Sequence, residues 1–214
     1  MSFDRVAPYY RRLETLVFGP QLQRARVEFV RAIASPRRAL IVGEGDGRFL
    51  AKFTRAHPDT QVDCLEASGR MIELARARLP AGARVQFIHA KIQEKKLAPA
   101  FYDLLVTHFI FDCFQKETLA AVVAHLAKAA TPQARWLVAD FSEPARGWRR
   151  FRARALIAIM YRFFGLAAGI EARSLVDYRP FLQAHNFVLE REACSPNEMI
   201  RSELWQHEVR RTAP

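Results

Sequence analysis

Three glycines stand at alternate positions directly after a short apolar run, in a segment that could bind a nucleotide. Gly43, Gly45 and Gly47 follow the run 39–42 and precede residues that can start a helix. Because glycine has no Cβ, such a loop can adopt strained dihedral angles, and its backbone N–H groups can approach a ligand closely. The pattern predicts a strand, a tight turn and a helix that together hold a nucleotide.

The spacing of these glycines helps to distinguish between nucleotides. A dinucleotide-binding loop has glycines at its first, third and sixth positions. Counted from Gly43, the sixth position here is Arg48, and the last glycine, Gly47, comes one residue earlier. The loop therefore argues against NAD and against a dehydrogenase.

A second apolar run, 61–66, follows one helix length later and ends in a carboxylate. In a βαβ unit, Glu66 would lie beside a ribose diol and could accept hydrogen bonds from both hydroxyls. Just after it, Ser68 can cap a helix, and Met71 in the first turn of that helix can offer a soft apolar face to a purine. Glu66 is thus the expected ribose ligand.

Together these motifs resemble those of the class I S-adenosylmethionine-dependent methyltransferases, whose glycine loop has this alternate spacing and whose second strand ends in an acid followed by a serine. The resemblance runs over most of the chain. Residues 3–10, Phe-Asp-Arg-Val-Ala-Pro-Tyr-Tyr, also look like the opening of the small-molecule methyltransferases of quinone biosynthesis. The resemblance implies S-adenosyl-L-methionine as cofactor, S-adenosyl-L-homocysteine as product and a small-molecule acceptor.

The residues that this resemblance assigns to the cofactor come from the glycine loop and from the ends of the next three strands. They are Gly43, Glu44, Gly45, Asp46, Gly47, Glu66, Ala67, Met71, Lys91, Ile92 and His108.

Two positions depart from the family pattern. Ile41 stands where most members have an acid, so we expect Glu44 or Asp46 to place a carboxylate near the ammonium and sulfonium charges of the cofactor. Lys91 stands where many relatives have an acid that contacts the adenine amino group. We therefore expect backbone groups of Lys91 and Ile92 to recognise adenine.

Three titratable side chains are candidates for catalysis: His108, Asp112 and Asp140. Methyl transfer from a sulfonium needs alignment above all, and it needs a base only where the acceptor must lose a proton. His108 or Asp112 could be that base, and Asp140 could form a wall of the acceptor pocket. Each also has a structural alternative. His108 could be a hydrogen-bonded histidine at a strand end, and Asp112 could cap the helix that starts near Lys116. Asp140 could be a cap or the partner of an arginine.

Residues 148–170 join a cationic start to a long apolar body that Arg162 interrupts. The uninterrupted apolar stretch is too short to span a bilayer. We expect a lid helix over an apolar or aromatic acceptor, while an interfacial helix on an anionic membrane and plain core packing stay open. The predicted acceptor-binding residues are Tyr10, Phe111, Tyr161 and Phe164.

The elements that must position these residues alternate between strand and helix, which predicts an α/β, Rossmann-like, doubly wound and mostly parallel seven-stranded sheet with helices on both faces. Pro20 is expected to split the helical lead 5–34 in two. The predicted strands are 39–42, 62–66, 85–89, 102–108, 135–141, 186–192 and 199–206, and the predicted helices between the first five strands are 48–56, 69–79 and 116–129. We expect a single domain, 1–214, made of a helical lead (1–38), a cofactor-binding core (39–142), a lid or substrate segment (143–186) and C-terminal strands (187–214).

Composition constrains the partners. The 214-residue chain is 50% hydrophobic, enough for a core without disulfides or metals, and its three cysteines, Cys64, Cys113 and Cys194, suggest neither a disulfide framework nor a metal site. With no signal-peptide pattern, we expect a cytoplasmic protein, with peripheral membrane association left open.

The net charge of +11 would attract phosphate groups, but no RNA-binding signature accompanies it. We interpret the arginines as a solvated surface and expect no nucleic-acid partner. An RNA or protein methyltransferase remains an alternative, although no Asn-Pro-Pro-Tyr-like motif follows the fourth strand. A non-catalytic nucleotide-binding or membrane-associated module is another. The arginine clusters are Arg24, Arg26, Arg31, Arg37 and Arg38, and Arg146, Arg149, Arg150, Arg152 and Arg154.

Overall fold

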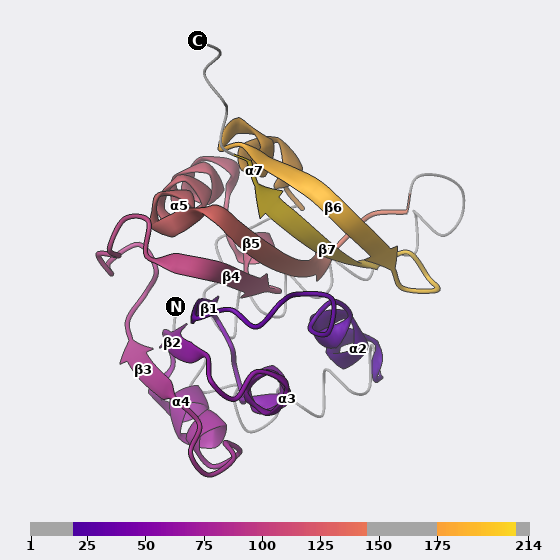
Figure 1. Ribbon diagram of the computed structural model, residues 1–214. Helices are drawn as coiled ribbons and strands as arrows, with labels where there is room; N and C mark the ends of the chain where they lie inside the picture. The colour runs from indigo at the N-terminus through magenta and orange to yellow at the C-terminus, as the bar shows by residue number, and fades with distance from the viewer. Residues whose placement is uncertain (1–18, 145–174, 209–214) are drawn as a thin grey trace.

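The computed structural model describes residues 19–144 and 175–208. In these ranges one seven-stranded sheet has the order β3-β2-β1-β4-β5-β7-β6 and lies between two layers of helices (Figure 1). The strands are β1 (Arg38–Val42), β2 (Gln61–Glu66), β3 (Val85–His89), β4 (Tyr102–His108), β5 (Ala130–Phe141), β6 (Phe187–Cys194) and β7 (Ile200–His207).

The first five strands pair in parallel, and β7 runs antiparallel to both β5 and β6. From β1 the chain builds the sheet outward through β2 to β3 and then returns to place β4 on the other side of β1. The order therefore reverses between β1 and β4. In open α/β sheets, ligands bind outside the carboxyl ends of the strands at this switch point.

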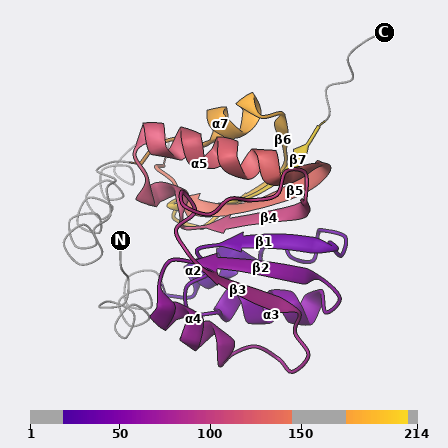
Figure 2. The ribbon, with the colours of Figure 1, turned by 90° about the vertical axis from the view of Figure 1, so that its left-hand side faces the viewer.

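Helices cover both faces of the sheet, because β1 buries alternate side chains on opposite sides. Leu40 and Val42 join the core beneath α5 and α7, whereas Ala39 and Ile41 join the core beneath α3. Figure 2 shows the two layers edge on. The helices are α2 (Gln21–Val27), α3 (Arg48–Ala56), α4 (Gly69–Arg76), α5 (Lys116–Ala129) and α7 (Arg179–Ala184), and a 3-10 turn, η2 (Phe111–Cys113), follows β4.

The predicted fold class is confirmed, and the two largest differences from the predicted boundaries lie at the end of α2 and at the start of β5. Pro20 precedes α2 as expected, but α2 ends at Val27, and residues 28–32 form turns with tighter hydrogen bonds, such as that from the Val30 N–H to the Val27 carbonyl. The fifth strand begins at Ala130, directly after α5, and its pairing with β4 is irregular around Pro132, which has no N–H to donate. Within the described ranges, no helix is both long and apolar enough to cross a membrane.

Candidate functional site

A cavity of about 350 Å³ opens at the carboxyl edge of β1 to β4, at the switch point of the sheet. Its volume falls in the range of small-molecule sites. The residues that line it come from α2, from the loops after β1, β2 and β3, and from the segment after β4. They are Arg26, Val42, Gly43, Glu44, Gly45, Asp46, Leu65, Glu66, Ala67, Met71, Ala90, Lys91, Ile92, Gln93, Glu94, His108, Phe109, Ile110, Cys113 and Phe114.

The glycine loop uses Gly45 and Gly47 for different purposes, although both have a positive φ (73° and 85°). A Cβ on Gly45 would have no heavy atom within 4 Å, so this backbone faces open space in the cavity wall. A Cβ on Gly47 would lie 2.5 Å from the Cα of Ala75 in α4. Gly47 is not among the cavity residues, and we revise its predicted role from cofactor binding to close packing of α3 against α4.

Glu66 lies on the floor of the cavity, where both of its carboxylate oxygens accept a backbone hydrogen bond. The Gly45 N–H donates to Oε2 and the Ser68 N–H donates to Oε1, each at 3.0 Å. Burial raises the pKa of Glu66, and these backbone donors oppose that rise. Because a carboxylate offers about four lone-pair sites, Glu66 can accept a further donor such as a ribose hydroxyl.

The segment after Glu66 starts α4 as the sequence predicted. Ser68 caps the helix, since its Oγ accepts from the Met71 N–H at 3.2 Å. This cap fixes Met71, which is buried and lines the cavity with Ala67.

The two acids of the glycine loop, Glu44 and Asp46, both line the cavity but have different partners. Glu44 is buried, and its Oε1 accepts from the Phe49 and Leu50 N–H groups at the start of α3; burial raises its pKa to about 8. Asp46 is paired with Arg48 at 2.9 Å and with Arg78 at 3.3 Å. Near neutral pH, Glu44 is therefore mostly protonated, whereas Asp46 is engaged by two arginines.

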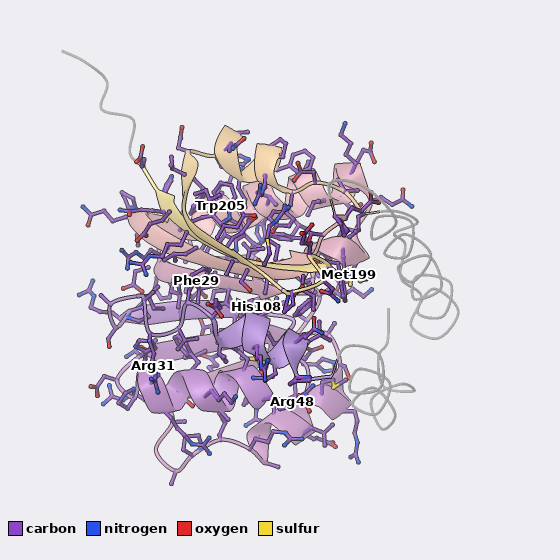
Figure 3. The ribbon with its side chains drawn as sticks, turned by 90° about the vertical axis from the view of Figure 1, so that its right-hand side faces the viewer. Phe29, Arg31, Arg48, His108, Met199 and Trp205 are labelled. Carbon is purple, nitrogen blue, oxygen red and sulfur yellow. The ribbon has the colours of Figure 1, made fainter. Side chains whose placement is uncertain are left out.

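His108 is 7% exposed and lies at the carboxyl end of β4, in the cavity wall. Its ring meets that of Phe49 edge on, with 4.5 Å between centroids. Burial first, and the positive charge of Arg26 second, hold its pKa well below the usual value. His108 is therefore a neutral imidazole near pH 7. Figure 3 places it centrally, between the levels of Trp205 in β7 and Arg48 at the start of α3.

Asp140 is 1% exposed and does not line the cavity. It accepts from the Phe111 N–H at 3.1 Å and from the Phe141 N–H at 2.8 Å, and burial followed by the charge of Asp112 raises its pKa well above the usual value. Asp112 also lies off the cavity wall; burial raises its pKa to about 6. We revise the predicted catalytic role of Asp140 to that of an anchor for the loop after β4.

The apolar wall of the cavity differs from the predicted one. Phe111 is 1% exposed and packs on Trp136 and Tyr178 in the core, so its predicted contact with the acceptor was wrong. Because η2 turns Phe111 inward, its neighbours line the cavity instead; these are Phe109, Ile110, Cys113 and Phe114.

Arg26 is a cavity residue that sequence reasoning missed. We assigned it to a solvated arginine surface, but it is 7% exposed, and its guanidinium carbon lies 5.1 Å from the centroid of the Phe109 ring. The sequence did hold a signal, because Arg26 lies four residues after the apolar Leu22 and four residues before the apolar Val30. Both of these flanking residues are buried in the structure. A charged residue on the apolar stripe of a helix faces the interior.

The third strand leads to the expected adenine end of the cavity. Lys91 and Ile92 line it, and the Lys91 ammonium pairs with Glu94 at 3.3 Å. Tyr10, Tyr161, Phe164 and the segment 148–170 lie outside the described residues. Within the described part of the chain, no three His, Cys, Asp or Glu side chains are grouped so as to hold a metal ion.

A family model described as a methyltransferase domain matches residues 39–147, which run from the second residue of β1 to beyond the end of β5. Over 109 residues the chain is 28% identical to malonyl-[acyl-carrier protein] O-methyltransferase from Halalkalibacterium halodurans, with 50% of this chain and 40% of that protein covered. Over 102 residues it is 26% identical to demethylmenaquinone methyltransferase from Chlamydia pneumoniae, with 48% and 44% covered. The match thus spans less than half the length of each relative.

Solved structures share the fold. The mitomycin 7-O-methyltransferase structure has a TM-score of 0.69 at 19% identity, with 97% of this chain and 61% of that chain covered. The 1,6-didemethyltoxoflavin-N1-methyltransferase from Burkholderia thailandensis, solved with 1,6-didemethyltoxoflavin and S-adenosylhomocysteine bound, has a TM-score of 0.67 at 14% identity, with 95% and 85% covered.

Proposed function

The chain belongs to the methyltransferase domain family, as a class I S-adenosylmethionine-dependent member, and on that premise we propose that it methylates a small apolar or aromatic acceptor. The observation that carries the proposal is the cavity at the switch point, where Glu66 offers two carboxylate oxygens beside the open backbone of Gly45. Every residue assigned to the cofactor from sequence lines this cavity, apart from Gly47.

The residues fit the cofactor from one end of the cavity to the other. We assign the adenine to the side of β3, next to Lys91 and Ile92, and the ribose hydroxyls to Glu66 at the end of β2. The methionine portion then extends towards β1 and β4. The open surface at Gly45 supports this assignment, since a side chain there would fill the space that an adenosyl group needs.

The bound cofactor supplies an activated methyl group, so the residues of the chain chiefly align the acceptor and exclude water. Phe109, Ile110 and Phe114 provide an apolar wall that favours an apolar or aromatic acceptor. His108, neutral at physiological pH, can accept a proton from an acceptor hydroxyl or amine. Asp140 keeps this wall in place through its hydrogen bond from the Phe111 N–H.

The relatives support a small acceptor without specifying it. Two of them are named for demethylmenaquinone and for mitomycin, whereas a third is named for a malonyl group on an acyl-carrier protein. We also propose the division of the chain stated above, with a core at 39–142 flanked by a helical lead and a lid or substrate segment.

The test is transfer of a deuterated methyl group from labelled S-adenosylmethionine, followed by mass spectrometry. The acceptors are a panel of hydroquinones, phenols and aromatic amines, with a malonyl thioester, transfer RNA and a cell protein extract alongside. We expect label on at least one small aromatic acceptor. Label confined to RNA or protein would overturn the acceptor class, and cofactor binding without any transfer would favour a non-catalytic module.

A further inference from the structure

The turn after α4 is connected to the glycine loop (43–47) by a single arginine side chain, that of Arg78. Its Nε donates a hydrogen bond to the backbone carbonyl of Asp46 at 2.7 Å, and its Nη2 pairs with the Asp46 carboxylate at 3.3 Å. Arg78 thus binds both the backbone and the side chain of one loop residue. Resting on the proposed function, we propose that Arg78 positions the glycine loop for the cofactor, and that Asp46 serves as its partner in the loop rather than as a counter-charge for the sulfonium.

The glycine loop is fixed to α4 at two points. Helices α3 and α4 lie next to each other on one face of the sheet (Figures 1 and 2), and the loop leads directly into α3. Gly47 packs closely on α4, since a Cβ there would lie 2.5 Å from the Cα of Ala75. The Arg78 N–H donates to the Ala75 carbonyl at 3.1 Å, which fixes the turn that carries its side chain. Close packing therefore sets the distance between loop and helix, and Arg78 adds directional hydrogen bonds.

The backbone that Arg78 binds borders the part of the loop that faces the cavity. Asp46 follows Gly45, whose N–H donates to the Glu66 carboxylate at 3.0 Å and whose backbone forms part of the cavity wall. Glycine loses more conformational entropy than other residues when it is fixed, and Asp46 stands between two glycines. Because Arg78 holds the carbonyl between them, the loop is ordered before a ligand arrives, and binding costs less entropy.

The Asp46 carboxylate is engaged on both of its oxygens, which argues against a role as counter-charge. The Nε of Arg48 donates to Oδ1 at 2.9 Å, and Nη2 of Arg78 pairs with Oδ2. With two guanidinium groups beside one carboxylate, these three side chains together offer no net negative charge to a sulfonium. The arrangement favours a role for Asp46 in anchoring the loop, in place of the electrostatic role expected from the sequence.

The test is titration calorimetry with two ligands that differ in the charge on sulfur. S-adenosylmethionine is a sulfonium, and S-adenosylhomocysteine is a neutral thioether. Arg78→Gln should weaken both by about tenfold, the lower end of the effect of a hydrogen bond to a charged group, because a displaced loop affects the adenosyl group that the ligands share. Asp46→Ala should also weaken both by factors that agree within about twofold. The double variant should lose less than the product of the two single losses, since the side chains share one contact.

The matched control is Arg76→Gln, on the last residue of α4. The guanidinium carbon of Arg76 lies 4.6 Å from the centroid of the Phe87 ring in β3, away from the glycine loop. This variant should leave both affinities within about twofold of the wild type, whatever its effect on Tm. The control separates a general loss of stability around α4 from a displaced loop.

The outcomes separate this inference from the proposed function. If the folded wild-type protein binds neither ligand, the proposed function fails. If folded Arg78→Gln keeps its affinity for S-adenosylhomocysteine within about twofold, Arg78 does not position the loop, while the proposed function stands. If Asp46→Ala weakens S-adenosylmethionine at least about tenfold more than S-adenosylhomocysteine, Asp46 acts on the sulfonium and the inference is overturned. Asp46→Ala leaves the backbone carbonyl for Arg78, so this comparison decides even if Arg78→Gln does not fold.

Discussion

Removing the carboxylate of Glu66 should weaken cofactor binding far more than it weakens the fold. In Glu66→Ala the ribose hydroxyls lose the carboxylate that the Gly45 and Ser68 N–H groups hold in place at the end of β2. Hydrogen bonds to a charged group contribute about 1.5–3 kcal/mol each. Water can enter the space left by the side chain and replace part of these hydrogen bonds. We therefore expect a net loss of about 3 kcal/mol of binding free energy, which corresponds to a roughly 100-fold weaker Kd.

The fold should tolerate the change with a modest loss. The Gly45 and Ser68 N–H groups lose their acceptor, which costs about 1–3 kcal/mol for a group left without one. They line or adjoin an open cavity that water can reach, and the substitution also removes a buried carboxyl whose pKa burial raises. We therefore expect Tm to fall by a few degrees while the circular dichroism spectrum stays that of the wild type.

The assay is calorimetric titration with S-adenosylhomocysteine, with Glu73→Ala as the matched control. Glu73 is an exposed acid on α4 whose carboxylate pairs with Arg70 at 2.7 Å, away from the cavity. The control should keep wild-type affinity. If Glu66→Ala stays folded and binds S-adenosylhomocysteine with a Kd within about threefold of the wild type, the ribose does not lie at the end of β2. That result would refute the assignment of Glu66 as the ribose ligand.

Three further substitutions test neighbouring parts of the loop. Gly45→Val should abolish binding of S-adenosylhomocysteine in calorimetry with the fold kept by circular dichroism, because its side chain enters the cavity wall; retained binding would contradict this. Gly47→Ala should lower stability to chemical denaturation by about 2 kcal/mol or more, since its Cβ would lie 2.5 Å from the Cα of Ala75; unchanged stability would contradict the packing role. Glu44 has a pKa raised from 4.5 to about 8, so its contribution to stability is complete below pH 4.5 and is lost as pH rises through 8. Glu44→Gln, which keeps an acceptor for the Leu50 N–H, should therefore remove part of the wild-type fall in Tm over this window, and an identical pH profile would speak against a buried neutral carboxyl.

Much of the fold could be predicted from sequence because hydrophobic periodicity and flanking signals agreed. The helices 48–56 and 116–129 and the strands 85–89 and 102–108 have the predicted limits. The end of α2 could not be predicted, since residues 28–34 keep apolar positions that a helix would also show. Residues 28–32 form turns instead, and Val30 and Ile33 still reach the core beneath α3.

The cofactor side of the site could be predicted better than the acceptor side. Glu66 is the last residue of β2, and Gly45 lies in the loop after β1. The carboxyl ends of parallel strands meet at one edge of the sheet, so the meeting of these two residues depends on topology alone. Phe111 depends on a single 3-10 turn, which rotates it into the core and leaves Phe109 at the cavity. Asp140 is the last residue but one of β5, and its side chain turns to the loop after β4 rather than to the cavity.

A crystal structure of the protein with S-adenosylhomocysteine is the measurement that tests the assignment of this cavity most directly. We predict density for the ligand along the carboxyl ends of β3, β2 and β1, with both ribose hydroxyls within hydrogen-bond distance of the Glu66 carboxylate and adenine beside Lys91 and Ile92. Density elsewhere on the protein, or a ribose that leaves Glu66 uncontacted, would contradict it.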